Sequence, residues 1–167
     1  MNIDDTSEND PSLGFRSPQV CTVVGITYRQ LDYWDRSGLL GPSLQQATGS
    51  GTQRLYTFQD IVTLRVVKRL KDAGTSLHKI RTAFEQLDDE VGEDWRESDI
   101  TLLSDGSSIY AARSDEEVID LLKRGQGVFG IAVRPVHDEV AGEIHRLFPD
   151  HPADVVAINE IAEAAGT

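Results

Sequence analysis

The sequence predicts an α+β protein in two parts: four helices with a β-hairpin over residues 16–90, and a small β-β-α-β-α domain over residues 99–167. Three observations favour this fold class. In the first part, helix-capping residues precede apolar residues at helical spacing. A Gly/Ser/Thr-rich run at 48–52 interrupts these helices where a hairpin would turn. In the second part, short β-like runs alternate with segments of helical periodicity.

Residues 1–15 precede the first helix and are polar, acidic and aperiodic, which predicts a disordered tail. Ser17 is a good helix cap, and Pro18 is tolerated in the first helical turn. Gly25 is placed to end this helix. Its buried stripe would consist of Val20, Val23 and Val24.

The second helix is marked at both ends. Thr27 and Gln30 form a capping box, and Gly38 is placed for a left-handed C-terminal cap. At about 100° per residue, Leu31 and Trp34 share one face, so we expect both to be core residues. Two helices joined by so tight a turn are typical of a helix-turn-helix. The solvent-facing side would carry Tyr28, Arg29, Asp32, Tyr33 and Arg36.

Two more helices follow the hairpin. Thr57 with Asp60 predicts the start of the third helix, which would stop at Gly74. Ser76 is placed to cap the fourth. Glycine and clustered acidic residues then interrupt the periodicity, so residues 91–98 are predicted to be a linker.

The second part begins with two β-like runs around a Ser-Asp-Gly-Ser turn, a hairpin signal. Ser114 with Glu117 predicts a helix start, and Gly125 its end. The continuous apolar run "VFGIAV", residues 128–133, predicts a buried strand. Two last helices are indicated by the spacing of Val140, Ile144, Leu147 and Phe148, and of Val155, Ile158 and Ile161.

The net charge of −12 is unevenly distributed along the chain. Residues 18–87 carry nine Lys/Arg and five Asp/Glu, whereas residues 88–167 carry six Lys/Arg and nineteen Asp/Glu. The first part is therefore the only basic one. Such asymmetry indicates a nucleic-acid partner for the basic segment, which the total charge would conceal.

The composition also excludes several classes of protein. A single cysteine, Cys21, leaves no disulfide framework and no multi-cysteine metal site. No apolar run approaches the ~20 residues of a membrane span, and the acidic N-terminus is unlike a signal peptide. We therefore expect a cytoplasmic, nucleoid-associated protein with no membrane partner.

The segments "ITYRQLDYWDRSGLL" and "GTQRLYTFQDIVTLRVVKRLKDAGTSLHKIR" resemble the MerR family of bacterial transcription regulators, from about Ser17 to Leu87. The matching elements come in order: helix-turn-helix, "GLL" turn, a wing ending in Arg-Leu-Tyr, then "F-x-D-I" and "G-x-S-x3-I" at two helix starts. The resemblance implies a winged helix-turn-helix domain that binds inverted-repeat promoter DNA as a homodimer, beside RNA polymerase. In the family, the second helix enters the major groove and the wing contacts the flanking backbone.

The expected DNA-binding residues lie on the second helix and the wing. Arginine's planar fork matches the O6 and N7 acceptors of guanine, and it also pairs with phosphate. Arg54 is expected to neutralise a phosphate, and Gly49 and Gly51 would let the wing tip approach the backbone closely. Asp32 would either accept from cytosine N4 or orient a neighbouring arginine, Arg29 or Arg36. The full set is Thr27, Tyr28, Arg29, Tyr33, Arg36, Gln53, Arg54 and Tyr56.

The chain departs from the typical family pattern after the fourth helix. Typical members continue with a long antiparallel coiled-coil helix that pairs the subunits, but no heptad run follows here. We therefore expect the C-terminal domain to join the subunits and to receive a ligand or protein signal. "GQGVFGIAV" is similar to a branch of the family with a compact domain of this kind.

Other readings of the second part are weaker. "GQGVFG" matches G-x-G-x-x-G, but a helix precedes it and a strand follows, the reverse of the dinucleotide-binding order. His137, His145 and His151, with Asp138 and Asp150, lack the close pairs of a zinc site and are expected to be scattered surface groups. We expect no metal, no cofactor and no catalytic residue. The alternative to a regulator is a DNA-binding adaptor or antitoxin-like protein whose C-terminal domain docks a protein partner.

Overall fold

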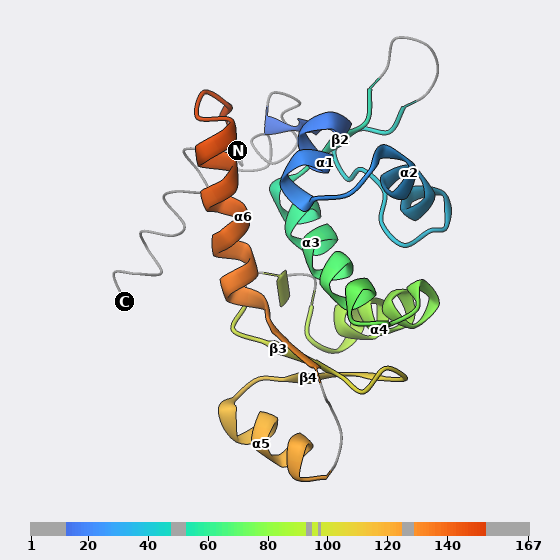
Figure 1. Ribbon diagram of the computed structural model, residues 1–167, viewed down its shortest axis with the longest axis vertical. Helices are drawn as coiled ribbons and strands as arrows, with labels where there is room; N and C mark the ends of the chain where they lie inside the picture. The colour runs from blue at the N-terminus through green and yellow to red at the C-terminus, as the bar shows by residue number, and fades with distance from the viewer. Residues whose placement is uncertain (1–12, 48–52, 93–94, 97, 125–128, 153–167) are drawn as a thin grey trace, which may run out of the picture. The chain divides into compact units, whose positions relative to one another are not determined.

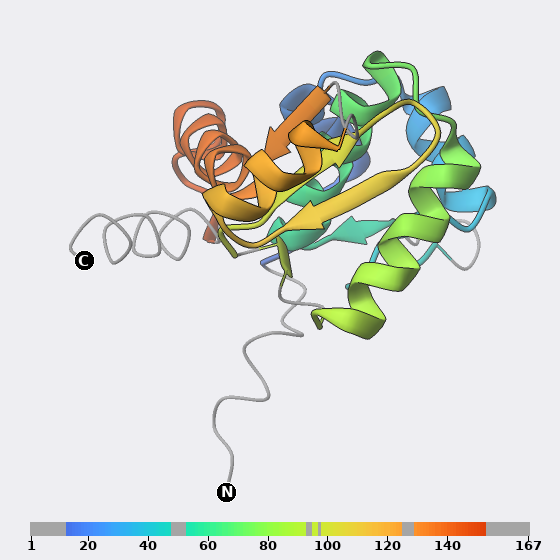
Figure 2. The same cartoon turned by 90° about the horizontal axis from the view of Figure 1, so that it is seen from below.

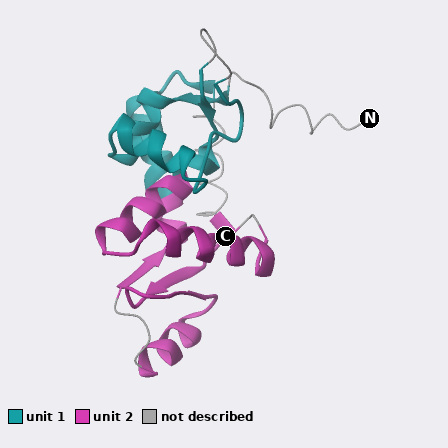
Figure 3. Cartoon of the chain, turned by 90° about the vertical axis from the view of Figure 1, so that its right-hand side faces the viewer, with its two compact units in different colours: residues 1–61, 138–167 teal, residues 62–137 magenta. Residues whose placement is uncertain are grey.

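The computed structural model describes residues 13–47, 53–92, 95–96, 98–124 and 129–152. It contains helices and two small antiparallel sheets, so the predicted α+β class is confirmed. The described chain forms two compact units, coloured separately in Figure 3. These units are residues 1–61 with 138–167, and residues 62–137.

The first helix, α1, spans Ser17–Val24 and ends at Gly25, whose φ of 79° is left-handed. Its cap position is Arg16 rather than the predicted Ser17, and the Gln19 side chain accepts from the Arg16 N–H at 2.9 Å. The tail predicted to run to residue 15 ends earlier, because Phe15 is fully buried and begins strand β1, Phe15–Arg16. Residues 1–12 lie outside the described residues.

The second helix, α2, spans Tyr28–Arg36. The predicted capping box is present: the Thr27 hydroxyl accepts from the Gln30 N–H at 3.1 Å, and the Gln30 side chain accepts from the Thr27 N–H at 3.0 Å. Gly38 follows the helix with φ 78°, as its predicted capping role requires. Local sequence alone therefore fixes both ends of this helix.

The hairpin after α2 pairs with the strand that directly precedes α1. Strand β2, Leu55–Tyr56, pairs antiparallel with β1, and Gln45 forms an antiparallel bridge with Leu55. The base of the hairpin is therefore part of the same small sheet as the entrance to α1 (Figure 1). The predicted tip, 48–52, lies outside the described residues.

The third helix, α3, spans Phe58–Asp72. Thr57 and Asp60 begin it as predicted, since the Asp60 N–H donates to the Thr57 hydroxyl at 3.0 Å. The buried Asp60 carboxylate also accepts from the backbone N–H and hydroxyl of Ser43, at 2.9 and 2.6 Å. This carboxylate thus joins the segment after α2 to the start of α3.

Helix α4, Leu77–Glu90, is capped by Ser76 as predicted. The segment after it is more than a linker, because Trp95 is fully buried and its indole N–H donates to Asp88 at 2.9 Å. The Trp95 ring lies 5.1 Å from Phe84, and the Arg96 guanidinium lies 4.6 Å over it. The prediction that residues 91–98 form a linker is therefore corrected at Trp95 and Arg96.

A three-stranded antiparallel sheet follows, in the order β4-β3-β5, in which β5 is formed by Phe129–Ala132 (Figure 2). Strands β3, Thr101–Ser104, and β4, Ile109–Ala112, form the predicted hairpin. In its turn, the Asp105 carboxylate accepts from the backbone N–H groups of Ser107 and Ser108 at 2.7 and 2.6 Å. These bonds, that of Ser108 first, lower the pKa of Asp105.

The last described elements are α5, β5 and α6. Helix α5, Asp115–Lys123, is capped by Ser114, and its predicted end at Gly125 lies outside the described residues. Strand β5, Phe129–Ala132, lies at an edge of the sheet, so the predicted strand is present, but of its four residues only Ile131 is buried. Helix α6, Val133–Leu147, begins directly after it. The helix predicted around Val155, Ile158 and Ile161 is also outside the described residues.

Candidate nucleic-acid interface

Helix α2 presents an aromatic and basic face to solvent. Tyr28 and Tyr33 are each 59% exposed, although large aromatic side chains are usually mostly buried. Arg29 is exposed, and the Arg36 side chain is 76% exposed. The structure therefore brings together on one short helix four of the residues predicted to bind DNA.

The opposite face of α2 anchors the helix in its unit. Leu31 is fully buried and Trp34 is 4% exposed, as their helical spacing predicts. Burying side chains of this size contributes roughly 1.5–3 kcal/mol each. Because Thr27 also caps the helix, the exposed face is held on a rigid element, as precise recognition requires.

Asp32 lies on α2 beside this face and forms ion pairs with two arginines. One carboxylate oxygen is 3.0 Å from Arg36 Nε, and the other accepts from Arg54 Nη2 at 2.8 Å. Of the two roles expected for Asp32, this geometry supports orientation of Arg36. No ion pair joins Asp32 to Arg29 among the described residues.

Arg54 is held against α2 by a network of polar contacts. Its Nε lies 3.2 Å from Asp35 Oδ2 and 3.3 Å from Gln46 Oε1, and its side chain is only 16% exposed. Gln46 in turn donates to Asp35 at 3.2 Å. Burial lowers the pKa of Arg54, but the bond to Asp32 and the charge of Asp35 raise it more, so the guanidinium stays charged.

Tyr56 is fully buried, although the sequence predicts that it contacts DNA. Within the described part of the chain, its hydroxyl has no hydrogen-bond partner. Burial, followed by the charge of Asp35, raises the pKa of this hydroxyl well above its usual value. We therefore leave Tyr56 out of the interface and assign it to the core under the hairpin.

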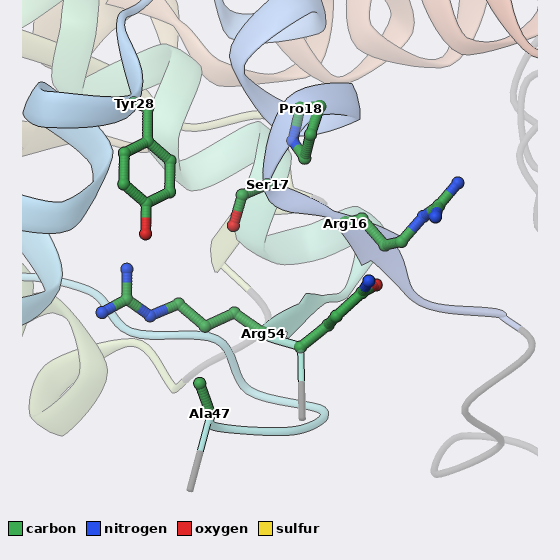
Figure 4. A pocket seen from close by; sticks show the side chains of 7 residues that line it. Arg16, Ser17, Pro18, Tyr28, Ala47 and Arg54 are labelled. Carbon is green, nitrogen blue, oxygen red and sulfur yellow. The ribbon is translucent and has the colours of Figure 1, made fainter. Parts of the chain in front are cut away.

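A pocket of about 330 Å³ opens between the start of α1, the start of α2 and the base of the hairpin. The Tyr28 hydroxyl points toward the guanidinium of Arg54 across it (Figure 4). Gln53, a predicted DNA-binding residue, is exposed at its edge. Seven residues line the pocket: Arg16, Ser17, Pro18, Tyr28, Ala47, Gln53 and Arg54.

Sequence reasoning missed Asp35 and Gln46 as functional candidates. Asp32 and Asp35 are spaced i, i+3, which puts both carboxylates on one side of a helix. That spacing was a signal for a shared cationic partner, but it did not identify Arg54, which is 22 residues from Asp32 in the sequence.

Other kinds of site have little support. Among the described residues, no three His, Cys, Asp or Glu side chains are grouped so that they could hold a metal ion. His137 is buried and His151 stacks on Phe15 at 4.0 Å, so these two are not the surface groups that we expected. Burial raises the pKa of the Cys21 thiol, which makes it less reactive. No described helix combines the length and the apolar character that crossing a membrane demands.

A family model matches the part of the chain that carries this candidate interface. Residues 15–87 match the model of the MerR HTH family regulatory proteins, which confirms the resemblance read from the sequence. The matched segment includes α1, α2, β2, α3 and most of α4.

Three relatives illustrate the range of similarity. An uncharacterised HTH-type transcriptional regulator of Mycobacterium tuberculosis is 52% identical over 140 residues, covering 84% of this chain and 61% of that protein. Nodulation protein NolA of Bradyrhizobium elkanii is 30% identical over 71 residues, covering 42% and 31%. Heavy metal-dependent transcription regulator 1 of Rhizobium meliloti is 34% identical over 59 residues, covering 35% and 38%. The chain thus spans about three fifths of the length of the mycobacterial relative.

Proposed function

We propose that the MerR-type helix-turn-helix domain of residues 15–87 makes this chain a sequence-specific DNA-binding regulator of transcription, with α2 as its recognition helix. The observation that carries the proposal is the exposed face of α2, where two tyrosines and two arginines stand on a helix anchored by buried residues. A helix of this kind fits the major groove, which is wide enough to admit it.

The proposed contacts divide by role. Arg29 and Arg36 supply forked donors for guanine edges, and the tyrosines Tyr28 and Tyr33 supply hydroxyls and flat apolar area. Thr27 and Gln53 are exposed beside them and would contact the phosphate backbone. The basic character of residues 18–87 favours approach to DNA despite the overall negative charge.

As the family resemblance implies, we propose that two copies bind an inverted repeat at a promoter that RNA polymerase also occupies. In dimeric helix-turn-helix proteins, the half-sites lie about one helical turn apart, 10–10.5 base pairs, or a multiple of that. The two-fold symmetry of the protein is then reproduced in the DNA.

Selection of bound duplexes from a random pool tests the proposal. The parent should enrich an inverted repeat, and Arg29→Ala should relax the preference at one position per half-site, with a loss there of about 1–3 kcal/mol. Arg146→Ala is a matched control, because Arg146 is 67% exposed on α6 and outside the proposed interface. A pool that remains random after selection by the parent would contradict the proposal.

The alternative function is a DNA-binding adaptor whose second part docks a protein. The observation that favours it is on α5, where Ile119 and Leu122 are 50% and 51% exposed beside an acidic first turn. Light scattering on the full chain separates the two: a homodimer alone supports the regulator, and a stoichiometric complex with another protein supports the adaptor.

A further inference from the structure

We propose that Arg54 is a positioning residue for DNA selectivity, which fixes the recognition helix through Asp32 and Asp35 and makes no phosphate contact of its own. The inference rests on the proposed function, since it concerns how α2 reads DNA. It differs from the role that the sequence predicts for Arg54, and the contacts of its guanidinium give the reason.

Two nitrogens of the Arg54 guanidinium are engaged by carboxylates, and the third, Nη1, is buried out of reach of solvent without a hydrogen-bond partner in the described part of the chain. Nη2 is 2.8 Å from Asp32 Oδ1 and Nε is 3.2 Å from Asp35 Oδ2, so one planar fork spans two carboxylates on the same helix. All three side chains are mostly buried, with exposures of 16%, 20% and 12% for Arg54, Asp32 and Asp35. Ion pairs sheltered from water to this degree are screened less by salt than surface pairs.

The network continues from the hairpin to the DNA-facing surface. Asp32 uses its second oxygen to bind Arg36 Nε at 3.0 Å, and Arg36 itself is 76% exposed. The position of Arg36 on the face of α2 therefore depends on a carboxylate that Arg54 holds in place. A substitution at Arg54 should therefore alter DNA binding indirectly, because it changes the orientation of the Arg36 side chain.

Charge compensation supports the same role. Two carboxylates on a recognition helix would repel the phosphates of DNA if no cation balanced them. Arg54 supplies that cation from the hairpin, at 2.8 and 3.2 Å from Asp32 and Asp35. The positive charge of Arg54 is thus neutralised by carboxylates within the protein, so its attraction for a phosphate is weak.

A substitution at Gly41 offers a second way to disturb these ion pairs, without changing any charge. A Cβ atom at this position would lie 2.6 Å from Asp35 Oδ1, too close for a real contact. Gly41→Ala should therefore displace the Asp35 carboxylate, the end of a flexible side chain, without removing any charge. It perturbs the network from outside α2.

The main experiment uses Arg54→Lys in the full chain. Lysine keeps the positive charge but has no fork with which to span Asp32 and Asp35. Binding to a duplex selected by the parent and to a random duplex is measured by fluorescence anisotropy over a salt series. We expect the ratio of the two affinities to fall about tenfold, with the salt slope for the random duplex unchanged.

Two variants accompany this measurement. Gly41→Ala should lower the affinity ratio in the same way, again with an unchanged salt slope for the random duplex. If circular dichroism shows that Arg54→Lys is unfolded, Gly41→Ala alone tests the inference. Arg146→Lys makes the same chemical change at an exposed site on α6 and should keep the parent ratio.

The outcomes separate this inference from the proposed function. A parent-like affinity ratio in folded Arg54→Lys and Gly41→Ala overturns the inference and leaves the proposed function standing. Equal losses of affinity for the selected and the random duplex in Arg54→Lys would identify Arg54 as a phosphate ligand and overturn it too. If the parent binds neither duplex, the proposed function fails and the inference fails with it.

Discussion

Removing the Tyr56 hydroxyl should stabilise the protein. Tyr56 is fully buried, and in the described structure its hydroxyl has no hydrogen-bond partner. A buried hydroxyl without a partner costs roughly 1–3 kcal/mol. Tyr56→Phe removes that cost and leaves a void of only one oxygen atom, so we expect a net gain of about 1 kcal/mol. For a chain of this size, the midpoint of thermal unfolding should rise by roughly 2–4 °C.

The assay is urea unfolding followed by circular dichroism, with Tyr28→Phe as the matched control. Tyr28 is 59% exposed, so the loss of its hydroxyl should leave the free energy of unfolding nearly unchanged. DNA affinity should show the reverse pattern, with no loss for Tyr56→Phe and a loss for Tyr28→Phe. A fall in stability of 1 kcal/mol or more in Tyr56→Phe would refute the reasoning, because it would reveal a hydrogen bond.

The same hydroxyl predicts a pH dependence. Burial, and then the charge of Asp35, raise the pKa of Tyr56 in the folded chain above the unfolded value of about 10. A raised pKa gives stability that is fully present below the unfolded pKa and is lost as pH rises above it. The stability advantage of Tyr56→Phe over the parent should therefore widen above about pH 10, and an advantage that stays constant there would contradict this cause.

Two further predictions concern the second unit. Trp95→Ala removes a fully buried side chain and should lower the free energy of unfolding by about 3–5 kcal/mol in urea titrations; a loss below 1 kcal/mol would contradict its place in the core. Asp105→Asn removes a carboxylate whose pKa is lowered by the N–H groups of Ser108 and Ser107. Its stabilisation is present above the unfolded pKa of about 4 and is lost as pH falls, so parent and variant should converge in acid unfolding curves, and a constant difference would exclude this origin.

The helix ends could be predicted from the sequence because the interactions that form them are local. Thr27 with Gln30, Thr57 with Asp60, and Ser76 each bond to a backbone group three residues away. The buried face of α2 followed from helical spacing in the same way. These features needed no knowledge of the rest of the fold.

The features that the sequence did not reveal depend on partners distant in the chain. The charge of Arg54 and its place on a wing predict a phosphate contact, whereas neither reveals its carboxylate partners on α2. Trp95 stands among acidic residues typical of a linker, and its burial depends on contacts with α4. Phe15 belongs to the core because β1 pairs with β2, about forty residues later in the chain. No local sequence pattern predicts contacts between residues so far apart in the chain.

The most direct test of the central claim is the affinity of the purified full chain for double-stranded DNA across a salt series. We expect measurable binding to any duplex at low ionic strength, tighter binding to a selected inverted repeat, and an affinity that falls steeply as salt is added. Arg29→Ala and Arg36→Ala should each reduce the preference for the selected site. Failure to bind any duplex at low salt would contradict the assignment of α2 as a recognition helix.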